Sequence, residues 1–303
     1  METLTVAIGT RNRGDSVVRT IRSVQASDHP SWAIRIVDQS DDDRTAAAIA
    51  PFLDDSRIRY RRSPTAGVAR ARNAAVAEAA GEIVLVTDDD CELAPDCLRE
   101  VDAAFAVDAR VAIVFGNILP APHDAREGFV PACVRDAPAL ARALRDKNRI
   151  DGAAACMAIR RSAWRALAGF DERFGLGTPL RSGEEIDLTI RALRMGFFVH
   201  QTPRARVTHH GFYRWSDHRA VIEQYWYGTG AAFGRNAVAE PLAIARVLGG
   251  LARRWATGVS PVASSLGTRA HRLLRLSAFA RGFAAGLRTV PQTSALAVPD
   301  AAA

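Results

Sequence analysis

Three consecutive aspartates follow a short apolar run, in which Ile83–Val86 and Thr87 lead into Asp88, Asp89 and Asp90. On an extended backbone Asp88 and Asp90 point to one side and Asp89 points to the other. Neighbouring carboxylates repel one another unless a cation lies between them. A hard divalent ion such as Mn²⁺ or Mg²⁺ prefers oxygen ligands and commonly also holds substrate phosphates. The motif therefore indicates a metal site, and an acidic turn after a strand is the alternative interpretation.

The stretches around this motif predict strands that alternate with helices. Strands are predicted over residues 4–8, 33–37, 58–60, 83–86 and 152–159, and the continuous apolar run over 83–86 is typical of a strand buried on both faces. Alternation of this kind favours a mostly parallel α/β sheet, which binds ligands at the carboxyl ends of its strands. Because Thr10, Asp38 and the three aspartates each follow a strand, we expect them to lie close together.

Two of the flanking polar residues have a possible role with a nucleotide. Asp38 can accept a hydrogen bond from a ribose or a base, or it can simply close an Asx turn. Arg72 lies near the start of a helix predicted over 68–80, where backbone N–H groups and a guanidinium favour phosphate. A solvated basic helix face is the alternative for Arg72.

A second group of ionisable residues comes later in the chain. Glu184, Glu185 and Asp187 fall in the first turn of a predicted helix that ends at Gly196. The helix dipole favours carboxylates at this place, but a carboxylate beside a reacting hydroxyl would act as a general base. Further on, His209 or His210 can complete a metal site, although a pair of surface histidines is the commoner finding.

The composition narrows the class of protein. The chain has 303 residues, 48% of them hydrophobic, and contains no apolar run long enough to cross a membrane. It shows no basic secretion signal, and its four cysteines have no metal-like spacing, so we expect a cytoplasmic protein with reduced thiols. Neither G-x-G-x-x-G nor G-x-x-x-x-G-K-[ST] occurs, which disfavours dinucleotide oxidoreductases and P-loop NTPases.

The excess positive charge belongs to one end of the chain. Residues 201–303 carry 13 arginines against four acidic residues, whereas residues 1–200 carry 27 basic and 29 acidic residues. The net charge of +7 therefore says little about the part that bears the aspartates. No nucleic-acid-binding motif accompanies the arginines, and we expect no nucleic-acid partner.

Taken together, these motifs resemble the family 2 glycosyltransferases, which have the GT-A fold and use nucleotide-sugar donors. The resemblance covers roughly residues 3–215 and depends on the order and spacing of several short motifs. They are the opening strand with Thr10-Arg11-Asn12-Arg13, Asp38, Gly67 with Ala71-Arg72-Asn73, Thr87-Asp88-Asp89-Asp90, Gly169-Phe170-Asp171-Glu172, Glu184-Glu185-x-Asp187 and the late histidine pair.

The resemblance implies a role for each of these residues. The nucleotide-sugar donor, a UDP-sugar by preference, would be held by Thr10, Asp38, Arg72, Asp88 and Asp89. Asp88 and Asp90 would hold Mn²⁺ or Mg²⁺, with His209 or His210 as a late ligand. Family members usually carry Glu-Asp at the helix start, and the second residue is the base. Here that position is Glu185, so the base is Glu185 or Asp187, while Glu184 would orient the acceptor.

The implied reaction is transfer of a sugar to a hydroxyl acceptor, with inversion at the anomeric carbon. The acceptor would be a glycan, a lipid-linked glycan or a small molecule. A metal-dependent hydrolase of nucleotide sugars or phosphate esters could use the same carboxylates. A non-catalytic protein that binds a membrane surface through its basic tail is a third interpretation.

The chain is expected to divide into a GT-A domain over 1–215, a basic, aromatic-rich helical extension over 216–290 and a disordered tail over 291–303. Helices are predicted over 241–255 and 269–287. The second carries an apolar stripe with interspersed arginines, formed by Leu276, Phe279, Phe283 and Leu287. Such a helix can lie on the inner face of the cytoplasmic membrane, form a dimer contact or close over the core.

Overall fold

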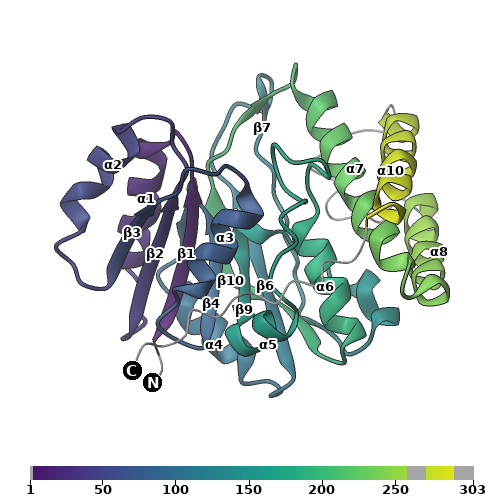
Figure 1. Cartoon of the computed structure of the whole chain (residues 1–303), viewed down its shortest axis with the longest axis horizontal. Coiled ribbons are helices and arrows are strands. Elements are labelled where there is room, and N and C mark those ends of the chain that lie inside the picture. The colour runs from purple at the N-terminus through teal and green to yellow at the C-terminus, as the bar shows by residue number, and fades with distance from the viewer. Residues whose placement is uncertain (1–2, 258–270, 290–303) are drawn as a thin grey trace.

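The computed structural model describes residues 3–257 and 271–289. The centre of the molecule is a mixed, mostly parallel sheet (Figure 1). Its strand order is β3-β2-β1-β4-β9-β6-β10-β5, and β8 also pairs with β10. The strands are β1 Leu4–Thr10, β2 Trp32–Asp38, β3 Ile58–Arg62, β4 Ile83–Asp88, β5 Cys91–Leu93, β6 Val111–Pro120, β8 Ala139–Ala141, β9 Met157–Arg160 and β10 Phe198–His209.

The first four strands of the chain are parallel, as their apolar runs predict. Strand β9 runs antiparallel to both β4 and β6, while β6 and β10 are parallel to each other. The expected fold class, a mixed and mostly parallel sheet flanked by helices, is confirmed.

Helices cover both faces of the sheet. They are α1 Gly14–Gln25, α2 Arg44–Ile49, α3 Val68–Ala77, α4 Cys97–Phe105, α5 Arg161–Ala166 and α6 Glu184–Arg194. The apolar sides of α1 and α4 pack into the core on one face, and those of α3 and α6 pack into the core on the other. The 3-10 helices are Ala50–Phe52, Leu144–Arg149 and Ala154–Cys156.

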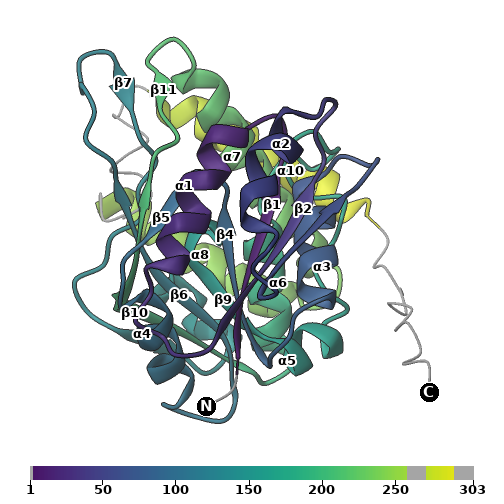
Figure 2. The same ribbon diagram turned by 90° about the vertical axis from the view of Figure 1, so that its left-hand side faces the viewer.

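Strand register brings the polar residues to one edge of the sheet. Thr10 lies opposite Asp38 on β2, and Gly9 lies opposite Asp88 on β4. Helix α3 crosses close above this point, because a Cβ at Gly9 would lie 2.8 Å from the Cβ of Ala71. A small two-stranded ribbon, β7 Gly128–Phe129 with β11 Tyr213–Arg214, rises beyond the same edge (Figure 2).

Of the strand expected over 152–159, only the second half forms. The apolar run over 152–159 forms the 3-10 turn Ala154–Cys156 before β9 begins at Met157. Tertiary contacts account for the difference: Thr87 donates a hydrogen bond of 2.8 Å to the carbonyl of Ala155, and the backbone of Gly152 packs against the ring of Phe115.

The C-terminal helices α7 His218–Ala237, α8 Pro241–Thr257 and α10 Arg272–Leu287 pack together beside α6 (Figure 1). Helices α7 and α10 approach so closely that a Cβ at Gly230 or Gly234 would overlap the carbonyl of Phe279 or Phe283. Phe279 and Phe283 of the predicted stripe therefore lie against the core, while its other two members, Leu276 and Leu287, are about half exposed.

Two expectations about this end of the chain stay open. Contact with a membrane surface remains a prediction, as does the domain division at residue 215. The expected tail over 291–303 lies outside the described residues. Within the described ranges, no helix is both long and apolar enough to cross a membrane.

Candidate active site

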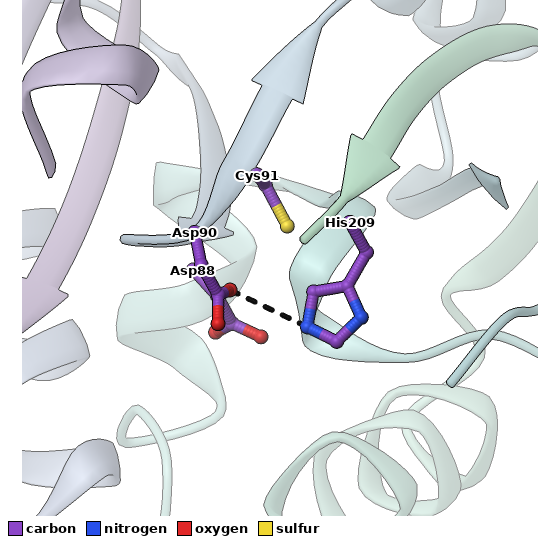
Figure 3. Close-up of side chains that lie close together, drawn as sticks. All are labelled: Asp88, Asp90, Cys91 and His209. Atoms are coloured by element: carbon purple, nitrogen blue, oxygen red, sulfur yellow. Dashed lines mark ion pairs between the residues drawn. The ribbon is translucent and has the colours of Figure 1, made fainter. Parts of the chain in front are cut away.

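Four side chains converge where β4, β5 and β10 meet. They are Asp88 at the end of β4, Asp90 just after it, Cys91 at the start of β5, and His209 at the end of β10 (Figure 3). One ligand atom of each lies within 4.8 Å of the others. The antiparallel pairing of β5 with β10 places His209 directly opposite Cys91, which explains how a residue so late in the chain joins the aspartates.

The residues of this cluster fit a hard divalent cation. Asp90 Oδ1 is buried and accepts no hydrogen bond from the described residues, although it lies at an ion-pair distance of 3.3 Å from Nε2 of His209. Burial alone would raise the pKa of Asp90, but His209 and Arg13 lower it, so the carboxylate stays ionised. Two carboxylates and an imidazole are donors that Mn²⁺ accepts.

Cys91 is the member of the cluster that sequence reasoning did not predict. Burial raises the pKa of its thiol well above the ordinary value, and the charges of Asp88 and Asp90 raise it further. A protonated thiol is a poor ligand for an oxygen-preferring ion, so the carboxylates and the imidazole are the better candidates. No spacing pattern in the chain distinguishes Cys91 from the other buried cysteines.

The two histidines differ in position. The ring of His209 is buried and its Nδ1 lies 3.1 Å from the carbonyl of Pro131. Although burial lowers the pKa of His209, its ion pair with Asp90 raises that pKa above its ordinary value. His210 lies outside the cluster, and its Nε2 is 3.2 Å from a carboxylate oxygen of Glu92.

Asp89 points away from the cluster, as the alternation along a strand predicts. Its carboxylate accepts hydrogen bonds from Thr10 Oγ1 at 2.7 Å and from the guanidinium of Arg13 at 3.2 Å. The same Arg13 nitrogen donates to Asp90 at 2.8 Å. Burial raises the pKa of Asp89 to about 6 despite these partners. Arg13 was part of the motif but was not singled out as a site residue.

Asp38 is fully buried and already has partners. Its carboxylate accepts hydrogen bonds from the N–H of Ser40 and from the hydroxyl of Tyr60, each at 2.8 Å. The Asx turn that the sequence left open is therefore present. Burial and the hydrogen bond to Asp38 raise the pKa of Tyr60 to about 12, which keeps its hydroxyl protonated. Tyr60 is a second residue at this edge of the sheet that the sequence did not reveal.

Arg72 connects the aspartates to the second acidic group. Its guanidinium donates to Asp88 Oδ1 at 2.8 Å and also pairs with Glu184. The side chain of Arg72 is 5% exposed and its pair with Glu184 lies out of bulk water, whereas Asp88 is 36% exposed. Thus the two motifs, which are nearly a hundred residues apart, share one cation.

Glu185 differs from its acidic neighbours. It lies in the first turn of α6, is buried, and forms no ion pair with the residues that the structure describes. Burial, followed by the charge of Glu184, raises the pKa of Glu185 to about 8. A carboxyl group with a pKa near neutrality has the property required of a general base.

Asp187 is held from several sides. It is inaccessible to solvent and pairs with Arg191 at 2.8 Å and with Arg235 at 2.7 Å, while Asn236 donates a hydrogen bond of 2.9 Å. Both of its oxygens are engaged by these donors. Neither oxygen is therefore free to receive a hydrogen bond from an acceptor hydroxyl.

Comparison with known proteins agrees with this arrangement. Residues 5–167, more than half of the chain, match the model of the family described as Glycosyl transferase family 2. The chain belongs to this family. It is therefore classed as a glycosyltransferase.

One curated relative of this glycosyltransferase is the succinoglycan biosynthesis protein ExoO of Rhizobium meliloti (strain 1021). It is 31% identical over 112 residues, which are 36% of this chain and 32% of that protein. The chain thus spans about a third of the length of this relative.

Solved structures share the fold of this glycosyltransferase. The mannosyltransferase PcManGT from Pyrobaculum calidifontis, in complex with GDP-Man and Mn²⁺, superposes with a TM-score of 0.62 at 18% identity, over 95% of this chain and 87% of that one. S. aureus TarS 1-349 in complex with UDP-GlcNAc gives a TM-score of 0.55 at 16% identity, over 77% of this chain and 66% of that one. The GT-A fold is therefore established for this chain.

In this family 2 glycosyltransferase, the tertiary structure brings most of the expected site residues together. Thr10, Asp88, Asp89, Asp90 and His209 form one group, which Arg72 connects to Glu184 and the first turn of α6. His210 lies apart from the metal candidates. The matched region ends at residue 167, so α6, His209 and the C-terminal helices lie beyond it.

Proposed function

We propose that this glycosyltransferase moves a sugar from a nucleoside-diphosphate donor to an acceptor hydroxyl in one displacement with inversion. The observation that carries the proposal is the contrast between two acidic groups joined by Arg72. One group has the donors for a cation, and the other contains Glu185, a buried carboxyl with a pKa of about 8.

The donor would lie along the carboxyl edge of the sheet. Thr10, Asp38 and Tyr60 surround the place for the nucleoside, and Arg13 and Arg72 are the cations nearest to the aspartates. Asp89 accepts hydrogen bonds from Thr10 and Arg13 and so holds both of these side chains in place. Asp88, Asp90 and His209 would hold Mn²⁺ or Mg²⁺, which when bound supplies a Lewis acid for the leaving diphosphate.

Glu185 is our choice for the base. Its carboxyl would take the proton of the acceptor hydroxyl as the oxygen attacks the anomeric carbon and the bond to the diphosphate breaks. Because its pKa is about 8, a deprotonated Glu185 is a stronger base than an ordinary carboxylate. Asp187 is less suited to this step, since two guanidinium groups already hold it. Glu184, paired with Arg72, would orient the acceptor.

The nucleotide is the first property to test, with UDP as our expected donor nucleotide. PcManGT is in complex with GDP-Man and TarS with UDP-GlcNAc, so both nucleotides belong in the experiment. Thermal unfolding would be measured with UDP, GDP and dTDP, each with and without Mn²⁺, because a ligand that binds the folded state raises the midpoint.

The variants are Asp88→Ala/Asp90→Ala and, as a control, Asp108→Ala, which removes a carboxylate in the turn before β6 that pairs with Arg110. We expect one nucleotide to raise the midpoint in a Mn²⁺-dependent manner in the wild type and in Asp108→Ala, and not in the double variant. Release of free sugar at the same rate with and without an acceptor would instead identify a hydrolase. No shift with any nucleotide would contradict the proposal.

A further inference from the structure

Helix α7 holds the segment that carries the proposed base. Ser182 Oγ donates a hydrogen bond of 3.1 Å to the carbonyl of Gln224 on α7. The next residue, Gly183, begins α6 in a left-handed conformation with a φ of 93°. A Cβ at this position would lie 2.7 Å from the carbonyl oxygen of Gly228, so α7 packs directly on the turn before Glu184.

A buried charge network extends this contact by two helical turns along α7. The guanidinium of Arg235 lies 2.7 Å from Asp187 Oδ1 and 2.9 Å from Asp171 Oδ2. The side chains of all three residues are at most 9% exposed. Arg235 thus joins α7, the first turn of α6 and the loop after α5 by ion pairs that exclude water.

Each carboxylate of the network also has partners other than Arg235. Asp187 also pairs with Arg191 and accepts a hydrogen bond from Asn236, and Asp171 also pairs with Arg173. Arg235 is therefore not required to neutralise either carboxylate. Its particular property is that one rigid guanidinium spans both of them, which a point charge cannot do.

We propose that Arg235 is a positioning residue for Glu185: by holding Asp187 and Asp171 at once, it sets the orientation of the first turn of α6. The proposal rests on the proposed function, in which Glu185 is the base. Glu185 and Asp187 are two residues apart in the same helical turn, so a rotation that releases one moves the other. An error of about 1 Å in such a group can lower a rate by about 100-fold.

The surroundings of Glu185 supply a readout for its position. The charged and titratable groups that face it are Glu184 beside it, Arg72 on α3, Cys133 in the segment between β7 and β8, Lys147 in the 3-10 helix Leu144–Arg149, and Tyr225 on α7. Burial is the main cause of its raised pKa. If the turn loosens, water reaches the carboxyl and its pKa falls towards the ordinary range.

The test compares Arg235→Lys with the wild type and with Arg281→Lys. Lysine keeps the charge but can reach only one of the two carboxylates. Arg281 lies on α10 and pairs with Glu223 at 2.8 Å on the surface, so its replacement is the matched control. Titration of Glu185 would be followed by NMR in protein labelled with ¹³C at the glutamate carboxyls, with Glu185→Gln to assign the signal.

We expect the pKa of Glu185 to fall by about one unit or more in Arg235→Lys and to stay unchanged in Arg281→Lys. With the donor that the thermal-unfolding experiment identifies, kcat of Arg235→Lys should fall by about tenfold or more while the donor KM stays constant. A folded Arg235→Lys variant with the wild-type titration and kcat would overturn the proposal, because a purely structural role moves neither.

A second variant covers the case in which Arg235→Lys does not fold. Arg235→Met/Asp171→Asn removes one charge of each sign and leaves Asp187 with Arg191 and Asn236. The same fall in the pKa of Glu185 is expected, and an unchanged pKa would again overturn the proposal. The titration requires no turnover. A wild type that transfers no sugar would therefore contradict the proposed function without affecting this result.

Discussion

The two acidic groups of this glycosyltransferase are neutralised in different ways. In the first, Asp88, Asp89 and Asp90 share the guanidinium groups of Arg13 and Arg72, and one oxygen of Asp90 accepts no hydrogen bond from the described part of the chain. In the second, Asp171 and Asp187 are each paired with two arginines. The first group is short of positive charge, while the second is saturated with it except at Glu185.

This difference assigns opposite chemistry to similar residues. A group of carboxylates short of positive charge is stabilised by a bound cation, and a cation is also what a leaving diphosphate needs beside it. A group in which the structural carboxylates are already paired can leave one buried carboxyl, Glu185, free to exchange a proton. The donor and acceptor ends that we propose for the site thus differ in the partners of their carboxylates rather than in the number of carboxylates.

The largest effect expected from this contrast concerns the rate of transfer. Glu185→Gln removes the proton acceptor and should lower kcat by about 1,000-fold, within the usual range for loss of a general base. Steady-state kinetics with the donor identified by thermal shift would measure it. Glu185→Asp, which keeps a carboxylate, should retain more activity than Glu185→Gln. Equal activity of Glu185→Gln and the wild type would show that Glu185 is not the base, and Asp187 would be the next candidate.

The next effect is on stability, and it depends on pH. The pKa of Glu185 is about 8 in the folded protein and 4.5 as an ordinary glutamate. Between these values the folded state keeps a proton that the unfolded state has released, so stability falls as the pH rises from 4.5 to about 8. Glu185→Gln removes this loss and should raise the free energy of unfolding by about 3 kcal/mol at pH 8.

Denaturant unfolding at pH 5 and pH 8 would measure this gain, which should shrink towards the lower pH. Glu184→Gln is the matched control with the opposite sign, because it takes a buried partner from Arg72 and should destabilise the protein. If Glu185→Gln were no more stable than the wild type at pH 8, Glu185 would not be a protonated buried group.

A smaller effect separates the two histidines. His209→Ala removes a candidate ligand and should weaken Mn²⁺ binding by at least about tenfold, the usual cost of losing even an outer partner of a metal site. His210→Ala removes a residue that pairs with Glu92 outside the cluster and should leave Mn²⁺ affinity nearly unchanged. Calorimetric titration with Mn²⁺ would compare the variants, and a reversed order would place the metal away from Asp90.

The smallest effect expected is at the nucleoside end. Tyr60→Phe removes the hydroxyl that donates to Asp38 and should lower the free energy of unfolding by about 1 kcal/mol. Nucleotide affinity should weaken a few-fold if Asp38 is part of the donor pocket. Tyr227→Phe removes a hydroxyl that donates no hydrogen bond to a described residue and serves as the control. An unchanged stability of Tyr60→Phe would show that this hydrogen bond does not support the pocket.

Local sequence patterns were sufficient to predict much of the fold. The stretches over 4–8, 33–37 and 83–86 form strands whose side chains are nearly all buried, whereas the stretch over 58–60 belongs to the edge strand β3, which leaves most of its side chains exposed. The run over 152–159 looked equally apolar, but it forms a 3-10 turn before β9 because of contacts with other parts of the chain. Local pattern and local structure disagree where a distant partner decides the conformation.

By itself, the sequence determined the alternation of strands and helices, the three aspartates at the end of a strand and the family motifs. All of these depend on residue type and on short spacings. Only the tertiary structure decided which cation each carboxylate receives, because Arg13 meets Asp90 across 77 residues and Arg235 meets Asp187 across 48. A pKa depends on burial and on such partners, so the difference between Asp90, our proposed metal ligand, and Glu185, our proposed base, emerges only when the chain is folded.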